Sequence, residues 1–121
     1  MASSFDAQAL LIKRLRDQRL RWVDLGAGLR VQVLTLRETE LPQLRTREVV
    51  DIVCDQAVDW SGFTEATLLG AHDGSSDPLP FTAEVWAEVA RNSMVHTTAV
   101  ADVLVADAQR VLQQRADARK N

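Results

Sequence analysis

One polar loop holds most of the side chains whose types could do chemistry. A nucleophile, a base and an orienting acid are all present among its residues, which are His72, Asp73, Ser75, Ser76 and Asp77. A catalytic triad needs its members to converge from separate rigid elements, and neighbouring residues of a single loop do not converge in that way. Asp-Gly and Ser-Asp-Pro sequences are instead typical of turns. We therefore interpret these residues as turn formers and predict a protein without enzyme activity.

Metal and phosphate chemistry are not indicated by the rest of the chain either. The two histidines, His72 and His96, and the single cysteine, Cys54, do not have the spacing of zinc ligands. Neither of the glycine-rich phosphate-binding patterns, GxGxxG or GxxxxGK[ST], occurs in the sequence. A lone cysteine cannot form an internal disulfide, which is typical of a reducing cytoplasm. We predict no metal, no cofactor and a cytoplasmic location.

The composition is typical of one small globular domain that spans residues 1–121. The chain is 46% hydrophobic and 26% charged, and it contains no apolar run long enough to cross a membrane. The N-terminus lacks the basic and apolar regions of a secretory signal. We therefore expect no membrane partner.

The net charge is −3, yet seven of the 14 basic residues lie between Lys13 and Arg37. Clustered Lys and Arg could bind nucleic acid. No recognition helix or stacking aromatics accompany the cluster, so we favour a solvated surface and predict no nucleic-acid partner. A small DNA-binding regulator remains an alternative.

The periodicity of apolar residues predicts a mainly helical α+β fold. Helices are expected over residues 5–18, 46–58, 82–94 and 98–116, while alternating residues at 19–37 predict a β-hairpin around Gly26–Gly28. Residues 59–81 are expected to form a loop. Thr46, Thr82 and Thr97 or Thr98 are the predicted N-caps, and Cys54 lies on a buried stripe. An isolated hairpin is marginal in water, so it must pack on the helices or pair with another chain through an exposed edge. We predict self-association.

The two ends of the 59–81 loop carry aromatic residues that could fasten it. Gly62 is placed to adopt the left-handed conformation that often ends a helix. We expect an apolar clasp, which also serves as a candidate partner site, formed by Trp60, Gly62, Phe63, Leu79, Pro80, Phe81, Thr82 and Trp86. A second candidate partner surface is the apolar stripe of the last helix, formed by Val100, Leu104, Ala108, Val111 and Leu112.

The edges of this loop resemble a known family. A Trp-Ser-Gly-Phe segment at 60–63, a polar loop ending near Asp77, and Leu-Pro-Phe-Thr at 79–82 opening a helix are similar to the tail assembly chaperones of long-tailed bacteriophages. The specific part covers about residues 58–90, and the rest matches in the order of its elements. The loop from Thr64 to Asp77 is longer than the usual spacing of that pattern.

The resemblance implies a non-enzymatic protein that binds the tape-measure protein, recruits tail-tube subunits and is absent from the finished virion. It would act in the cytoplasm of the bacterial host. Such proteins are often made in a short form and a frameshift-extended form, and Arg119, Lys120 and Asn121 could be encoded by a slippery run of adenines. Another phage structural protein, such as a head–tail connector or tail completion protein, is the main alternative.

Overall fold

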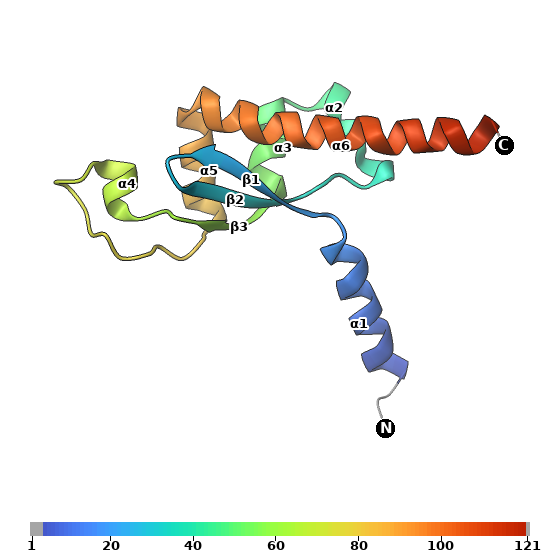
Figure 1. Ribbon diagram of the computed structural model, residues 1–121, viewed down its shortest axis with the longest axis horizontal. Helices are drawn as coiled ribbons and strands as arrows, with labels where there is room; N and C mark the ends of the chain where they lie inside the picture. Colours follow the sequence, from blue (N-terminus) through green and yellow to red (C-terminus); the bar gives the residue numbers. More distant parts are fainter. Residues whose placement is uncertain (1–3, 121) are drawn as a thin grey trace.

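A three-stranded antiparallel sheet forms the centre of the protein in a computed structural model that describes residues 4–120 (Figure 1). The strands are ordered β1-β2-β3 and comprise β1 (Leu20–Gly26), β2 (Leu29–Leu34) and β3 (Ala57–Ser61). The helices are α1 (Ser4–Asp17), α2 (Gln43–Thr46), α3 (Val49–Gln56), α4 (Glu65–Leu69), α5 (Ala83–Asn92) and α6 (Met94–Lys120), with a 3₁₀ turn, η1 (Glu38–Glu40). The predicted fold class, a mainly helical α+β domain, is confirmed.

One face of the sheet is buried beneath α3, α5 and α6. Val23, Val31 and Trp60 lie side by side across the three strands, and each is less than 10% exposed. They join a core that includes Trp86 of α5 and Leu104 of α6. The opposite face of the sheet is more exposed and carries Trp22, Asp24 and Arg30, in keeping with the alternation of residues in the predicted hairpin.

The third strand is a correction to the prediction of a helix over 46–58 followed by a loop from residue 59. The pairing of β2 with β3 is irregular, because Gln32 pairs with Asp59 whereas the next residue, Val33, pairs with Ala57. Val58 is therefore an extra residue, and this bulge places Ala57 and Trp60 on the same buried face. A spacing of three between buried residues imitates a helix, which explains why the periodicity extended the predicted helix into the strand.

Two predicted helix starts were also wrong. Thr46 ends the short helix α2, and α3 begins at Val49 after Glu48, whose side chain makes no capping bond. At the last helix, the Ser93 hydroxyl accepts a hydrogen bond from the backbone N–H of His96, so α6 begins at Met94. Thr97 is instead buried, and its hydroxyl donates to the carbonyl of Ala90 at 2.6 Å. By contrast, Thr82 caps α5 as predicted, since its hydroxyl accepts from Val85 N.

Helix α1 forms where the sequence predicts a helix. Ser3, which precedes it and has a side chain of the type that caps helices, lies outside the described residues. The helix projects away from the body of the protein (Figure 1), and every side chain from Phe5 to Asp17 is exposed. The chain has an accessible surface of 8343 Å². A compact monomer of 13.4 kDa is expected to expose about 6,500 Å². Within residues 4–120, none of the helices has the length and apolar character needed to span a bilayer.

Candidate functional site

The predicted aromatic clasp is assembled around Trp60. Its ring stacks on Phe63 with centroids 4.3 Å apart, and Phe81 meets it edge-on at 5.5 Å. The indole N–H of Trp60 donates to the carbonyl of Leu79 at 2.8 Å, and the Leu79 N–H donates to the carbonyl of Phe63 at 2.9 Å. Trp60 and Phe63 are buried, so the clasp fastens both ends of the loop and leaves little of its aromatic surface for a partner.

Three members of the clasp have positions or roles other than those expected. Gly62 has a φ of +89°, but it follows strand β3 rather than a helix. Trp86 is fully buried and donates its indole N–H to the carbonyl of Val53 on α3 at 3.2 Å. Pro80 is exposed beside the clasp. Gly62 and Trp86 therefore hold the sheet and the helices together, while the stacked rings close the loop.

The chemistry-bearing residues of the loop do not form a catalytic arrangement. The Ser75 hydroxyl accepts from the backbone N–H of Asp77 at 3.0 Å, and the Ser75 carbonyl accepts from Ala66 N at 3.0 Å. His72 and Asp73 are exposed and share no hydrogen bond. The predicted loop is more ordered than expected, because α4 forms within it and Thr64 bridges to Pro78. Among residues 4–120, no group of three His, Cys, Asp or Glu side chains is arranged to hold a metal ion.

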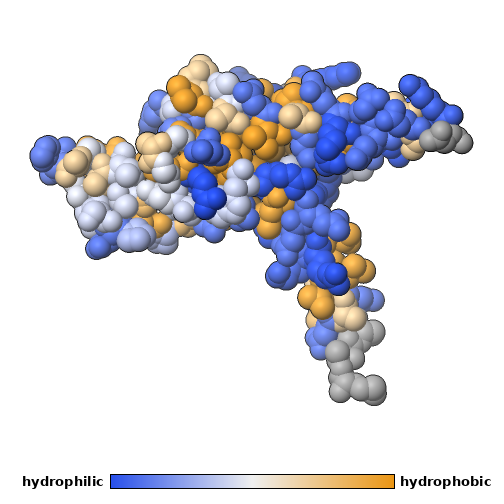
Figure 2. Space-filling view, viewed as in Figure 1, coloured by the Kyte–Doolittle hydropathy of each residue, from blue (hydrophilic) through white to orange (hydrophobic). Residues whose placement is uncertain are grey.

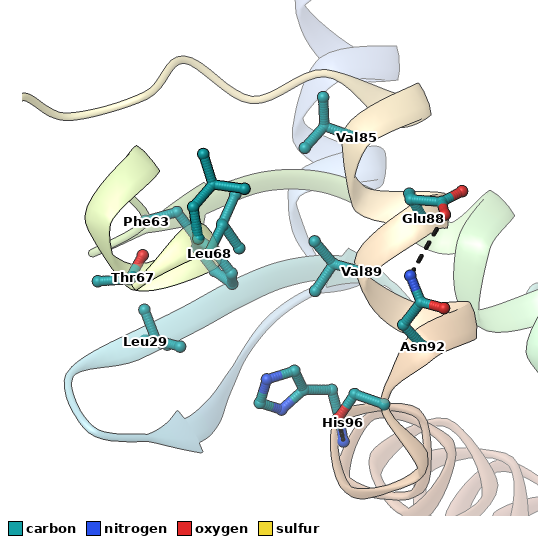
Figure 3. A pocket seen from close by; sticks show the side chains of 11 residues that line it. Leu29, Phe63, Thr67, Leu68, Val85, Glu88, Val89, Asn92 and His96 are labelled. Carbon is teal, nitrogen blue, oxygen red and sulfur yellow. Dashed lines mark hydrogen bonds between the residues drawn. The ribbon is translucent and has the colours of Figure 1, made fainter. Parts of the chain in front are cut away.

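A hollow of about 430 Å³ lies between α4 and α5, in the size range of clefts that bind ligands, about 300–1,000 Å³ (Figure 3). We call it the α4–α5 groove, and its apolar lining is formed by Leu29, Phe63, Leu68, Leu69, Val85 and Val89. Glu88 lies at one side, hydrogen-bonded to Asn92 one turn later. His96 lies at the bottom of the view, and its Nδ1 is buried without a hydrogen-bond partner among the described residues. This groove was not predicted from the sequence, because its walls come from four separate segments.

The predicted partner surface on the last helix is largely inaccessible. Val100, Leu104 and Ala108 are at most 4% exposed, because the protein's own sheet and α3 and α5 pack on them. Val111 is half-buried, and only Leu112 of this set is exposed. An apolar stripe has the same pattern in a sequence whether it packs on its own chain or on another. The stripe of the last helix was for this reason predicted to bind a partner, although it packs on its own core.

The basic residues between 13 and 37 divide into two groups. Arg19 donates to the carbonyl of Thr35, Arg21 pairs with Asp107 at 3.3 Å, and Arg30 lies over the Trp22 ring. These arginines hold elements of the fold together, as the interpretation of a solvated structural surface implies. Arg14 and Arg16 on α1 make no ion pair with any residue in 4–120.

The exposed side of α1 is the feature that sequence analysis missed. Five large apolar side chains of this helix, Phe5, Leu10, Leu11, Ile12 and Leu15, are between 54% and 76% exposed. Figure 2 shows hydrophobic residues along the projecting helix, apart from the main body. The apolar spacing was visible in the sequence and was used only to predict a helix, without assigning a surface to it. Exposed apolar side chains gathered on one helix in this way are typical of a protein–protein contact.

Cys54 provides a direct probe of the core. Its thiol extends from α3 toward the carbonyl of Ala87 on α5 and is buried there. This burial raises the pKa of Cys54 above its ordinary value. A thiol of raised pKa holds little reactive thiolate near neutrality. We expect Ellman's reagent to label folded protein at pH 7.5 at least tenfold more slowly than protein in 6 M guanidinium.

The same shift gives a pH dependence with a defined sign. The folded state keeps the Cys54 proton to a higher pH than the unfolded state does. The free energy of unfolding therefore falls as pH rises through and above about 9, where the unfolded chain loses this proton first. Denaturant titrations at pH 7.5 and 9.5 measure the change, with Cys54→Ala as the matched control that lacks the thiol. Equal losses in the two proteins would contradict the assignment.

Comparison with known proteins gives no relative. No family model, no curated protein and no solved structure matches this chain. The fold and the site define a small α+β protein with a fastened loop, an apolar groove and an unpartnered helix, and its function is inferred from these features.

Proposed function

We propose that this protein is a non-enzymatic assembly chaperone that binds an apolar, helical client through α1. The observation that supports the proposal is that α1 projects from the body with its large apolar side chains exposed. A chaperone of this kind must offer apolar surface that a client can cover and later leave. Burial of such side chains against a client helix contributes about 25 cal/mol per Å² of apolar area.

The client that we propose is the tape-measure protein of a long-tailed bacteriophage, with tail-tube subunits as later partners. The support is the resemblance of residues 58–90 to tail assembly chaperones, together with a helix suited to packing against long client helices. A gene for a tape-measure protein directly downstream of this one is expected. Purified virions are expected to lack the protein, whereas a connector or completion protein would be found in them.

We expect α1 to be required for client solubility. Replacing Leu11 and Leu15 with serine removes two of the five large apolar side chains that α1 exposes. The body should stay intact, because both side chains are more than half exposed. Co-expression of the tape-measure protein with this variant should leave most of the client in the insoluble fraction, whereas the wild-type chain should keep it soluble. The measurement is the soluble fraction of client and its co-purification with the chaperone.

Leu112→Ser is the matched control, since Leu112 is as exposed as Leu15 but lies on α6. The control should retain client solubility, and both variants should unfold within about 0.5 kcal/mol of the wild type. A Leu11→Ser/Leu15→Ser variant that holds the client as well as the wild type does would remove α1 from the proposal.

A further inference from the structure

The charges of this chain are separated along its length. Residues 13–47 contain nine basic and four acidic residues, while residues 48–90 contain nine acidic residues and no lysine or arginine. Among residues 4–120, the ion pairs of these nine acidic residues are limited to Asp51 and Asp55. The α4–α5 half of the protein therefore carries uncompensated negative charge, and the α1 half carries uncompensated positive charge. Surfaces of opposite sign attract one another when two copies meet.

The positive charge lies beside the apolar face of α1. Successive residues of a helix are separated by 100° of rotation, so Phe5, Leu11, Ile12 and Leu15 lie on one face. By the same geometry Arg14 lies on one side of this face and Arg16 lies on the other. The face is thus an apolar stripe between two unpaired guanidinium groups.

The α4–α5 groove has the complementary character. Its lining is apolar, Glu88 is part of its wall, and Glu84 lies one helical turn earlier on α5. Neither glutamate forms an ion pair within residues 4–120. His96 also lines the groove, and its Nδ1 is buried without a hydrogen-bond partner among the described residues.

The helix α1 of a chain does not lie near the groove of the same chain. It is joined to the start of β1, whereas α4 follows Gly62, which contacts the Gly28 turn at the far end of that strand. Seven strand residues separate these ends by roughly 20 Å. Figure 1 shows α1 and α4 projecting from opposite ends of the sheet. With α1 in the position that the structure shows, an occupant with the same properties comes from another molecule.

We propose that α1 of one protomer docks in the α4–α5 groove of a second copy of this chain. The contact joins two different surfaces, so each copy offers one helix and one groove, and the copies associate head to tail into an open chain or a closed ring. The excess surface fits this arrangement. Each protomer exposes about 1,850 Å² more than a compact monomer would, and two standard interfaces bury about 800 Å² each on one partner.

Two variants, each deprived of one surface, test the proposal. The helix-deficient chain carries Leu11→Ser and Leu15→Ser and keeps its groove. The groove-deficient chain carries Leu69→Arg and Glu88→Arg and keeps its helix; both of these side chains are exposed, so the fold tolerates the change. The mass of each, alone and mixed, is measured by analytical ultracentrifugation over micromolar concentrations, with circular dichroism and thermal unfolding as controls for folding.

A head-to-tail contact predicts a specific oligomeric state for each chain and for their mixture. The wild type should form oligomers, each variant alone should be monomeric, and an equimolar mixture should form a 1:1 heterodimer that grows no further. Leu112→Ser should oligomerise as the wild type does. A groove-deficient chain that still dimerises alone would indicate α1 pairing with α1 and would overturn the proposal, as would a strictly monomeric wild type or a mixture that remains monomeric.

Salt provides a second readout on the heterodimer. Because the arginines beside the α1 stripe face the glutamates of the groove, its dissociation constant should rise about tenfold between 50 and 500 mM NaCl. Arg14→Glu with Arg16→Glu in one chain should weaken binding, and so should Glu84→Arg with Glu88→Arg in the other chain. Combining the two pairs exchanges the charges on both sides and should restore binding. Failure of the exchange to restore binding would contradict the proposed docking. These results do not depend on the client, so they are separable from the chaperone test.

Discussion

Replacing Trp86 with alanine is expected to lower the free energy of unfolding by about 3–5 kcal/mol, the range typical of a buried tryptophan. Trp86 is fully buried beneath the sheet and is one of the largest side chains in the core. Its indole N–H donates to the carbonyl of Val53, which is one of the last four carbonyls of α3 and therefore has no partner within that helix. The alanine variant loses both the packing and this cap.

Trp86→Phe separates the two contributions. The phenyl ring retains most of the apolar contact but leaves the Val53 carbonyl unsatisfied, which costs about 1–3 kcal/mol. Trp22→Ala is the matched control, because Trp22 lies on the exposed face of the sheet, where it contacts Arg30. We expect the control to change stability by less than about 1 kcal/mol. Urea unfolding measures all three variants, and equal losses for Trp86→Ala and Trp22→Ala would contradict the role assigned to Trp86.

Local signals in the sequence predicted the elements that depend on neighbouring residues. Helix α1, the β1–β2 hairpin and the Thr82 cap of α5 were expected and are present. Each depends on features a few residues apart, such as alternation around a glycine turn or a hydroxyl three residues before a backbone N–H. Aromatic residues at both ends of the loop were enough to predict the clasp.

The features that the sequence did not predict depend on contacts between distant segments. Strand β3 exists because it pairs with β2, and the bulge at Val58 gives its buried residues a helical spacing. The hairpin prediction left one edge of β2 without a partner, and β3 of the same chain pairs with that edge. Of the two hairpin strands, β1 therefore keeps an unpaired edge. The groove requires α4, β2, α5 and the start of α6 to meet, and no single segment of sequence contains that information.

The predicted partner surface was wrong for the same reason. The stripe on α6 was proposed for a partner and packs on the core, while α1, for which no surface was proposed, exposes its apolar side chains. Periodicity identifies an apolar face, but only the fold decides what covers it. The two proposals for α1 are therefore linked, because a second copy and a client would use the same face, and binding of one would exclude the other.

Replacing Gly62 with alanine is the second substitution expected to have a large effect. Its φ of +89° is a conformation that side chains disfavour by about 1–2 kcal/mol. A Cβ at this position would also lie 2.2 Å from the carbonyl oxygen of Gly28, so the backbone of the β1–β2 turn would have to move. Because that turn supports the entry to Phe63 and the clasp, we expect a total loss of about 3–4 kcal/mol in the free energy of unfolding.

Gly26 offers a control that isolates the contact from the backbone strain. It has a similar φ of +85°, but a Cβ added there would meet no atom within 4 Å. Gly26→Ala should therefore cost about 1–2 kcal/mol, the strain alone, and the difference between the two variants measures the clash with Gly28. Urea unfolding followed by circular dichroism measures the free energy of unfolding of both variants. Equal losses of the free energy of unfolding in the two variants would mean that the β1–β2 turn adjusts freely. The close packing of β3 against this turn would then contribute nothing to holding the groove and the clasp in place.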